Sequence, residues 1–341
     1  MPSRLPMIAA RSLGAMPQFA LSALGEKRTL AAMQHSGLPV ELIDRRDGYI
    51  PEHALAEFVG HLARALGQDG LGLFWAPYLT VADFGKWGSY VLSAPDLRSS
   101  LERGANVMPI HSNVDRTYLR EQSGMAIYYY DFGLRAHPSY PDLAYSAVSY
   151  VLSIPRHYLG ATWSPTAIEF DIPKGQGNIL ADETFGCGTT FGHKRLRIRF
   201  PQAVLDTPRP DIHDRQVVTR QDILRDVGDE VPNSFIHSVR LTLFRQLADQ
   251  NLSADKLALT LGIGIRTLQR KLHGEGTSIR DIMNHVRMER ARELLALEDA
   301  SVTSVATALG YSSPNNFSRA FAAQNDLSPQ SYAKLVRKQM R

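Results

Sequence analysis

The stretch LGYSSPNNFSRAFAAQNDLSP, residues 309–329, carries the pattern that decides the fold of the C-terminal part of the chain. Phe317 and Phe321 are four residues apart, so in a helix they lie on the same face. The opposite face is polar and carries Asn315, Asn316, Ser318 and Arg319. Such a helix buries one side against its own domain and presents hydrogen-bonding groups on the other.

The same pattern occurs once more, earlier in the chain. Ala258 lies four residues before Gly262, and Ala306 lies four residues before Gly310. A small residue allows two helices to cross closely, and glycine tolerates the conformation of a tight turn. The sequence therefore predicts two helix-turn-helix motifs, ADKLALTLGIGIRTLQRKL and SVTSVATALGYSSPNNFSRAF.

The outward faces of the second helix in each motif carry residue types that read DNA bases. These faces are Arg266, Gln269 and Arg270 in the first motif, and Asn315, Asn316, Ser318 and Arg319 in the second. Arginine matches O6 and N7 of guanine, and glutamine or asparagine matches N6 and N7 of adenine. The alternative is that both faces are only solvated surfaces of packed helices. Two matching copies favour DNA recognition.

A long helix is expected between the two motifs. Residues 281–297 are 17 residues with helical character, which corresponds to roughly 25 Å at 1.5 Å per residue. We therefore expect residues 234–341 to form an all-α domain in which this helix joins two recognition helices. At a spacing near one DNA turn, about 34 Å, both could enter successive major grooves as a monomer.

Charge is unevenly distributed along the chain. Residues 231–341 contain 15 Lys and Arg against 9 Asp and Glu, a net charge of +6, whereas residues 1–230 have a net charge of −2. Contacts from Lys and Arg to phosphates supply most of non-specific affinity for nucleic acids. The basic C-terminal part is therefore compatible with a DNA partner.

The length of 341 residues predicts two domains. Residues 206–233 are rich in Pro, Asp and Arg, which predicts an exposed linker with a short helix near 220–226. Residues 1–205 show both periodicities of an α+β domain. Helices are predicted at 51–66, 96–107 and 140–152, and strands at 116–121, 124–132, 167–170 and 196–200.

Residues 234–337 resemble the DNA-binding domain of the AraC/XylS family of bacterial transcription regulators. The resemblance is carried mainly by Gly310, Phe317, Arg319, Phe321, Ser328, Pro329 and Tyr332. It implies base contacts by Arg266, Gln269, Arg270, Asn315 and Arg319, and contacts to the DNA backbone by Thr267, Asn316 and Ser318. Gly264 departs from the family pattern, because many relatives have Ser or another capping residue there.

Residues 71–104 and 183–210 resemble the arabinose-binding-like effector domain of one branch of this family, which regulates amino-acid and lipid metabolism and virulence. The chain departs from that branch at FGCGTTFG, where relatives commonly read Phe-Gly-Cys-Pro. The resemblance implies an activator that binds promoter DNA and a small-molecule effector, contacts RNA polymerase and forms a homodimer through residues 1–205. The alternative is a DNA-binding architectural protein without an effector.

Aromatic residues in the N-terminal part are candidates for an effector pocket, although such residues more often belong to a core. The predicted effector-binding residues are Trp75, Trp87, Tyr128 and Tyr130. Strand alternation points Tyr128, Tyr130 and Phe132 to one side and Ile127 and Tyr129 to the other, and leaves open which side faces a cavity.

Other chemistry has little support in the sequence. Cys187 is the only cysteine, so there is no disulfide framework or cysteine-rich zinc site, and a cytoplasmic location is expected. Cys187 and His193 could form a nucleophile and base, but the motifs typical of hydrolases and phosphate-binding loops are absent. We predict no enzyme activity, no cofactor, no metal site and no membrane segment.

Overall fold

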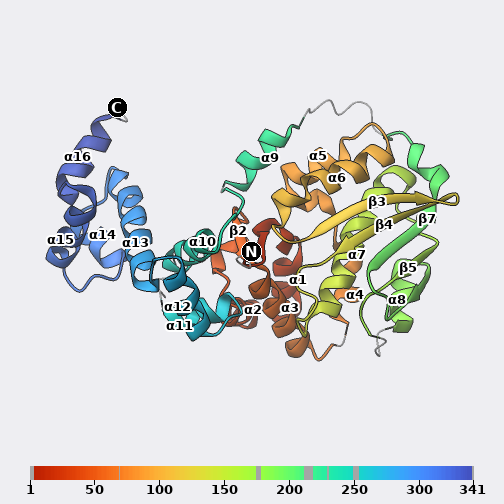
Figure 1. Ribbon diagram of the computed structural model, residues 1–341, viewed down its shortest axis with the longest axis horizontal. Coiled ribbons are helices and arrows are strands. Elements are labelled where there is room, and N and C mark those ends of the chain that lie inside the picture. The colour runs from red at the N-terminus through yellow and green to blue at the C-terminus, as the bar shows by residue number, and fades with distance from the viewer. Residues whose placement is uncertain are drawn as a thin grey trace. The chain divides into compact units, whose positions relative to one another are not determined.

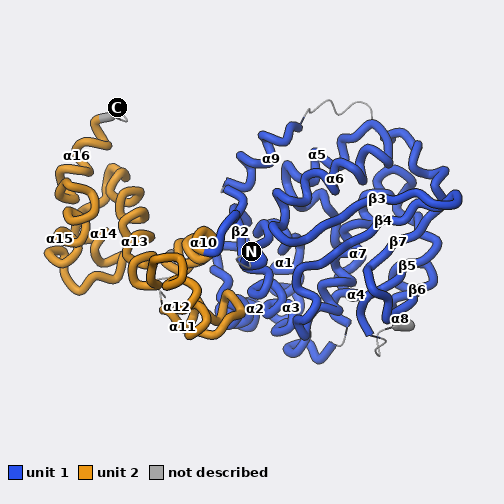
Figure 2. Tube along the Cα trace, in the orientation of Figure 1, with its two compact units in different colours: residues 1–235 blue, residues 236–341 orange. Residues whose placement is uncertain are grey.

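The computed structural model describes residues 4–68, 70–173, 178–210, 218–228, 230–248 and 253–339 (Figure 1). It divides into two compact units, residues 1–235 and residues 236–341 (Figure 2). The first unit is α+β and the second is helical, which confirms the fold class predicted from the sequence. No helix among the described residues is both long and apolar enough to cross a membrane.

Unit 1 contains a five-stranded sheet with the order β3-β4-β7-β5-β6. Its strands are β3 (Arg116–Gln122), β4 (Met125–Asp131), β5 (Ala167–Glu169), β6 (Gly188–Thr190) and β7 (Leu196–Pro201). Neighbouring strands are antiparallel except β5 and β6. A separate antiparallel pair joins β1 (Met7–Ala9) to β2 (Tyr49–Pro51).

The turn between β3 and β4 sets the register of the sheet. Ser123 and Gly124 have φ angles of 52° and 76°, which a two-residue hairpin turn requires. Ser123 and Gly124 therefore form the turn, and β4 begins at Met125. Across the sheet, Tyr128 is buried against the helices, whereas Tyr129 lies on the other face and stacks on Tyr118 at 4.6 Å.

Unit 1 also contains α-helices. They are α1 (Met16–Leu24), α2 (Glu26–His35), α3 (Glu52–Leu66), α4 (Leu71–Trp75), α5 (Lys86–Leu92), α6 (Leu97–His111), α7 (Tyr140–Leu159), α8 (Asn178–Phe185) and α9 (Arg220–Val227). Short 3₁₀ turns include η1 (Ala10–Leu13) and η4 (Val81–Phe84). The helix α7 is longer than predicted, because it continues through Pro155.

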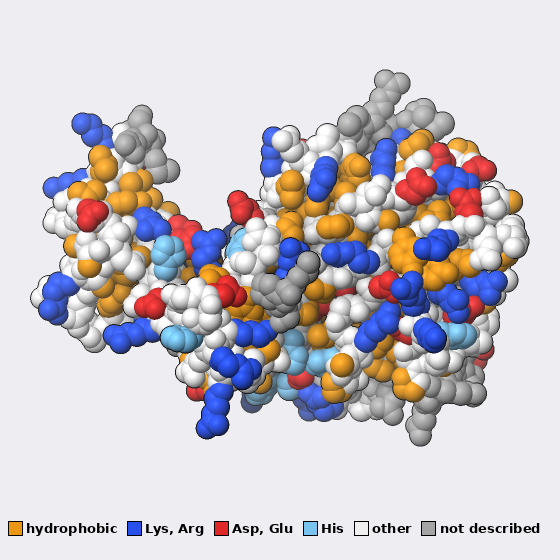
Figure 3. Space-filling view, viewed as in Figure 1, with side chains coloured by type: hydrophobic (Ala, Val, Ile, Leu, Met, Phe, Trp, Pro, Cys, Tyr) orange, Lys and Arg blue, Asp and Glu red, His pale blue; other side chains and the backbone are white. Residues whose placement is uncertain are grey.

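The outer face of the sheet is rich in arginine. Figure 3 shows Lys and Arg side chains gathered around hydrophobic ones on this part of unit 1. Arg197 and Arg199 on β7 both form ion pairs with Glu169 on β5, and the guanidinium of Arg120 lies over the ring of Tyr118. The face is therefore polar and partly neutralised, in contrast to the apolar inner face.

The region predicted as an exposed linker contains a helix that packs on unit 1. In α9, Ile223 and Val227 lie four residues apart and are buried in the core of unit 1. Asp226 forms an ion pair with Arg11 at 2.9 Å, and the carbonyl of Val227 accepts a hydrogen bond from Gly48 N at 2.6 Å. The region was predicted to be exposed, and the apolar pair Ile223 and Val227 explains why its helix is buried instead. The linker boundaries at 205 and 233 stay predictions.

Unit 2 consists of helices. They are α10 (Phe235–Ala248), α11 (Ala254–Thr260), α12 (Ile265–Gly274), α13 (Ile279–Ala296), α14 (Val302–Ala308), α15 (Pro314–Asn325) and α16 (Pro329–Gln339). The helix predicted at 281–297 is α13, which begins two residues earlier. Its N-cap is Ser278, whose hydroxyl accepts a hydrogen bond from Asp281 N at 3.1 Å.

The two predicted turns have the same geometry. Gly262 and Gly310 have φ angles of 67° and 75°, in the left-handed region that favours glycine. After Gly262, Ile263 N donates to the carbonyl of Ala258 at 3.1 Å, and the equivalent bond after Gly310 runs to the carbonyl of Ala306 at 3.0 Å. The repeat read from the sequence is therefore a structural repeat.

Candidate nucleic-acid interface and ligand cavity

The helix α15 presents its polar residues outward. Its N-cap is Ser313, whose hydroxyl accepts a hydrogen bond from Asn316 N at 3.2 Å. Phe317 and Phe321 are fully buried and belong to a row of rings that runs from Tyr311 to Tyr332, with centroids 5.4 to 5.7 Å apart. This row fixes the rotation of the helix. Asn315, Asn316 and Arg319 are consequently exposed, and Ser318 is half-buried.

The helix α12 is oriented in the same way by Leu268 and Leu272, which are fully buried. Its exposed residues are Arg266, Gln269 and Arg270, and Thr267 is half-buried. Gly264 is the N-cap residue and has extended backbone angles, but it has no side chain to accept a hydrogen bond from the first turn. The two recognition helices therefore differ at their N-termini.

Asn316 is hydrogen-bonded to Arg319, a link that the sequence analysis missed. The guanidinium of Arg319 donates to Oδ1 of Asn316 at 2.7 Å, and Nδ2 of Asn316 donates to Oγ of Ser312 at 3.1 Å. The chain of bonds holds the arginine against its own helix. The three-residue spacing of Asn316 and Arg319 is the signal that could have revealed it.

An open groove of about 630 Å³ lies beside Gln269, between α12 and α13. Its polar lining includes His273 from α12 and Arg280, Asn284 and Arg287 from α13. The sequence analysis did not single out these residues. Their positions on α13 are four and then three residues apart, which places them on one helical face and could have indicated them. The groove adds positive charge next to a predicted base-reading side chain.

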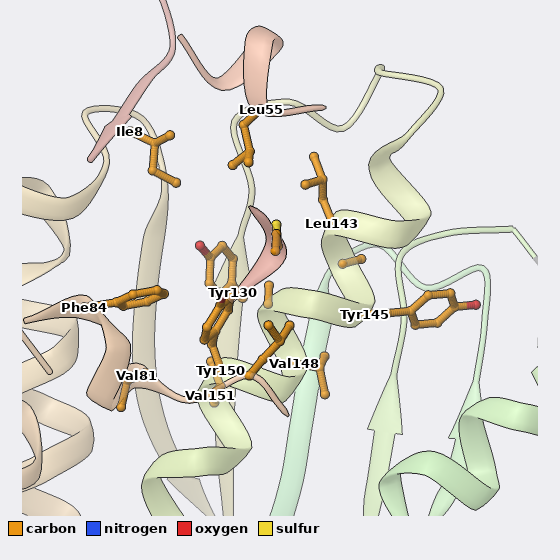
Figure 4. Packing of buried hydrophobic residues seen from close by; sticks show 14 of the residues in the cluster. Ile8, Leu55, Val81, Phe84, Tyr130, Leu143, Tyr145, Val148, Tyr150 and Val151 are labelled. Atoms are coloured by element: carbon orange, nitrogen blue, oxygen red, sulfur yellow. The ribbon is translucent and has the colours of Figure 1, made fainter. Parts of the chain in front are cut away.

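Unit 1 contains a narrow cavity of about 60 Å³ with aromatic walls. The aromatic residues that line it are Phe84, Trp87, Tyr128, Tyr130, Phe132 and Tyr150. Figure 4 shows the rings of Phe84, Tyr130 and Tyr150 close together, whereas Tyr145 points away from them. The sequence left open which side of the strand faces a cavity, and the structure shows that it is the side of Tyr128, Tyr130 and Phe132.

The four predicted effector-binding residues divide three to one. Trp87, Tyr128 and Tyr130 line the cavity, and Trp75 does not. Trp75 is buried in α4, packs edge-on against Phe19 and donates its indole N–H to Oγ of Ser146 at 2.8 Å. Its role in the structure is to support the wall of the cavity, since Ser146 is part of the lining.

His111 is the main polar group of the cavity, and nothing in the sequence pattern at the end of α6 pointed to it. Its Nε2 lies 3.3 Å from Oγ of Ser12, and that hydroxyl donates to the carbonyl of Ala9 at 2.6 Å. The hydroxyl therefore accepts from Nε2–H, which leaves Nδ1 as an acceptor. Burial lowers the pKa of His111 to about 4, so the ring is neutral near pH 7.

A buried pair of carboxyl groups lies beyond Tyr130. The Tyr130 hydroxyl donates to Oδ2 of Asp115 at 2.8 Å, and Oε1 of Glu52 accepts from Oγ of Ser112 at 2.7 Å. Burial, with Asp115 as the second cause, raises the pKa of Glu52 well above its usual range. Burial also raises the pKa of Asp115 to about 6. The pair is therefore more stable with a proton bound than with both carboxyl groups ionised.

One cluster has the residue types of a metal site, which the sequence analysis did not predict. His53, Glu57 and His137 bring one ligand atom each within 4.8 Å of one another. Nε2 of His137 lies 3.1 Å from Oε1 of Glu57, and Nδ1 of His137 accepts from Ser139 N at 3.1 Å. The ring proton is therefore on Nε2, in the bond to Glu57, and a metal at Nε2 would have to displace it.

Two models of known protein families match the chain, one in each unit. Residues 28–209 match the family model of the arabinose-binding domain of AraC transcription regulators, and residues 257–335 match that of a helix-turn-helix domain. The chain belongs to the AraC family of transcription regulators. The chain thus carries an arabinose-binding-like N-terminal domain and a C-terminal helix-turn-helix domain.

Several curated transcriptional regulators are similar to part of the chain. An uncharacterized HTH-type transcriptional regulator of Mycobacterium bovis is 33% identical over 147 residues, which are 42% of each protein. The transcriptional activator NphR of Rhodococcus is 26% identical over 41% of this chain and 36% of its own. The chain therefore spans less than half the length of these relatives. The transcriptional regulator CdpR from Pseudomonas aeruginosa is 21% identical in structure-based alignment, with a TM-score of 0.37 over 79% of this chain and 88% of its own.

The structure gives no nucleophilic pair at Cys187. Burial raises the pKa of the Cys187 thiol to about 11, with Asp182 as the second cause, so the thiol stays protonated near pH 7. His193, the candidate base, lies 2.8 Å from Oγ1 of Thr190. Cys187 is half-buried and packs at the edge of the core.

Proposed function

We propose that this AraC-family protein is a sequence-specific activator that reads promoter DNA through α12 and α15 and responds to a small-molecule effector in unit 1. The proposal rests above all on two helix-turn-helix motifs with the same turn geometry and exposed polar recognition faces. Arg266, Gln269, Arg270, Asn315 and Arg319 read base edges, and Thr267, Asn316 and Ser318 contact the DNA backbone. Each type of side chain suits its proposed partner.

Activation is supported by the names of two relatives. NphR of Rhodococcus is named a transcriptional activator, and RhaS of Klebsiella pneumoniae, 35% identical over 24% of this chain and 29% of its own, is named an HTH-type transcriptional activator. A promoter-bound activator of this kind contacts RNA polymerase. We therefore include RNA polymerase among the partners of the chain.

Residues 1–205 form the proposed homodimer contact. Phe74 and Tyr78 are 45% and 68% exposed, and their four-residue spacing makes them a candidate apolar contact. Linking two DNA-binding units raises the effective concentration of the second unit at a promoter with two sites. Sedimentation of the full chain and of a Phe74→Ser, Tyr78→Ser variant tests the contact, and a wild-type chain that stays monomeric at all concentrations would contradict it.

The cavity is connected to α9, the last helix of unit 1, through Asp226. Arg11, next to the cavity residue Ser12, forms the ion pair with Asp226, and Lys86 N, next to Trp87 on α5, donates to Oδ2 of Asp226 at 3.0 Å. A Cβ on Gly85 would lie 2.6 Å from Oδ2 of Asp226, so these groups are in close contact. A shift of the cavity walls therefore reaches the helix that precedes the DNA-binding domain.

Selection from random-sequence DNA duplexes by the full chain tests the reading of DNA. We expect enrichment of two short conserved blocks about 10 bp apart. The double variant Arg266→Ala, Arg319→Ala should lose the enrichment, whereas Arg225→Ala, which removes an exposed arginine of α9, should keep it. No enriched sequence with the wild-type chain would favour the architectural alternative and contradict the proposal.

A further inference from the structure

We propose that the cavity of unit 1 binds an uncharged, flat and largely apolar molecule that carries one hydrogen-bond donor. This inference rests on the proposed control by an effector and names the chemical class of that effector. It excludes sugars, although the matching family model is named for arabinose. It also excludes amino acids, amines and fatty acids, which carry charge at neutral pH.

The exclusion of charged ligands follows from the lining of the cavity. None of the described residues that line it is Asp, Glu, Lys or Arg. A buried charge without a partner costs several kcal/mol, and a ligand with a carboxylate or an ammonium group would meet no opposite charge here. His111 is neutral and does not supply one.

The exclusion of sugars follows from donors and acceptors that are already in use. Ser146 donates to the carbonyl of Asp142 at 2.7 Å, Trp87 Nε1 donates to the carbonyl of Val107 at 3.2 Å, and the Tyr130 hydroxyl donates to Asp115. Ser12 both donates and accepts within the protein. Most hydroxyl groups of a sugar would therefore remain unpaired, at about 1–3 kcal/mol each.

His111 supplies an acceptor that can select a ligand donor. Its Nε2–H is committed to Ser12, so Nδ1 can accept from a hydroxyl or N–H group. The surrounding walls are aromatic: the ring of Phe84 stacks on His111 at 4.8 Å, and the ring of Trp87 lies 5.3 Å from His111. A flat ring with one donor matches this combination of aromatic walls and the acceptor of His111.

Binding requires the walls to separate. The cavity of about 60 Å³ is smaller than the roughly 150 Å³ of a cavity known to hold benzene. The ring centroids of Phe84 and Tyr150 are 4.5 Å apart, so a ring can enter only when these two side chains part. Phe84 is the last residue of η4 and is followed by Gly85 and Lys86, which contact Asp226. The movement that admits the ligand therefore acts on the attachment of α9.

Titration of the full chain with matched small compounds tests the class. The uncharged probes are phenol, indole and toluene, and the comparison compounds are benzoate, benzylamine and arabinose. We expect the uncharged probes to raise the melting temperature of unit 1 and to change the fluorescence of Trp87, and we expect no effect from the others. Ala147→Phe, which fills the cavity, should abolish the response without loss of DNA binding.

The variant His111→Phe tests the acceptor separately from the fold. The wild-type chain should bind phenol about 2- to 12-fold more tightly than toluene, the range expected for one neutral hydrogen bond. His111→Phe should bind toluene and lose the preference for phenol. Equal binding of phenol and toluene by the wild-type chain would overturn the role of His111.

The outcomes separate this inference from the proposed function. Stabilisation by arabinose or by a charged compound would overturn the ligand class but would keep control by an effector. No binding of any uncharged probe, or a full response in Ala147→Phe, would overturn the cavity as the site. Neither result would affect the DNA sequences selected by α12 and α15, which test the regulator itself.

Discussion

The recognition helices of unit 2 and the cavity of unit 1 are built in opposite ways. Each proposed recognition helix places its proposed DNA-contacting side chains within five residues of one another, on a face oriented by buried residues such as Leu268 and Phe317. The cavity is lined by buried residues that are far apart in the chain, from Ile8 to Ile154. The difference indicates that the two proposed activities can be altered separately: DNA reading depends on a local helix, and ligand binding depends on the packing of the whole of unit 1.

Phe317→Ala should have the largest effect and should be confined to unit 2. Phe317 is fully buried between Tyr311 and Phe321, so its truncation should cost about 3–5 kcal/mol of unfolding free energy. Calorimetry of the full chain should show a lower unfolding transition for unit 2 and an unchanged one for unit 1. Equal shifts of both transitions would contradict the separation of the two units.

Glu52→Gln tests the buried carboxyl pair of unit 1 through pH. Because the pKa of Glu52 is raised in the folded chain, the folded state holds this proton more tightly than the unfolded state does. The stability from this proton is complete below the unfolded pKa of Glu, and it is lost as pH rises toward the folded pKa. Glutamine keeps the shape without the proton equilibrium.

We therefore expect Glu52→Gln to be more stable than the wild type near pH 8, because the wild type has lost the stability of this proton there. The advantage should disappear near pH 4. Denaturant unfolding of both proteins across this range measures it. The exposed change Glu26→Gln serves as a control that should show no such dependence. A constant difference between Glu52→Gln and the wild type at all pH values would contradict the account.

Arg319→Ala and Gln269→Ala should each lose roughly 1–3 kcal/mol of binding free energy on the preferred DNA and relax the preference at one base position. Asn316→Ala should weaken binding to all sequences. Through the lost bond to Arg319, it should also relax the preference at the position of Arg319 to a smaller extent. Binding to a library of site variants measures these effects. Uniform losses for all three variants would contradict the assignment of base-reading residues.

The smallest expected effect concerns the caps of the two recognition helices. Gly264→Ser should stabilise α12, and Ser313→Gly should destabilise α15, each by a few tenths of a kcal/mol. The two changes make the helices exchange their capping residues. Chemical denaturation of unit 2 in the full chain gives the values, and changes of the same sign would show that the caps do not explain the difference between these helices.

The helical periodicity made unit 2 predictable from its sequence, because the position of a residue along its helix determines whether its side chain is buried. Phe317 and Phe321 are buried as the pattern predicted, Leu268 and Leu272 are buried in the same way in α12, and the glycine turns have the expected conformation. The base-contacting roles stay predictions. The sequence analysis missed the bond between Asn316 and Arg319, since it depends on side-chain conformation.

Unit 1 was predictable in its strands and main helices but not in its cavity. Alternation separated Tyr128 and Tyr130 from Tyr129, but the cavity side depends on how the sheet packs against α6 and α7. His111 and Ser12 are 99 residues apart, and their contact is set by tertiary packing. The sequence predicted the short helix that is α9, but not its burial, because Ile223 and Val227 find their partners in distant parts of unit 1.

Hydroxyl-radical footprinting of the full chain on a selected DNA site tests the central claim most directly. The account predicts that each subunit protects two segments about 10 bp apart on one face of the duplex, because α12 and α15 enter successive major grooves. Arg266→Ala should weaken protection of one segment and Arg319→Ala that of the other. Protection of a single groove per subunit, or loss of both segments together in each variant, would contradict the account.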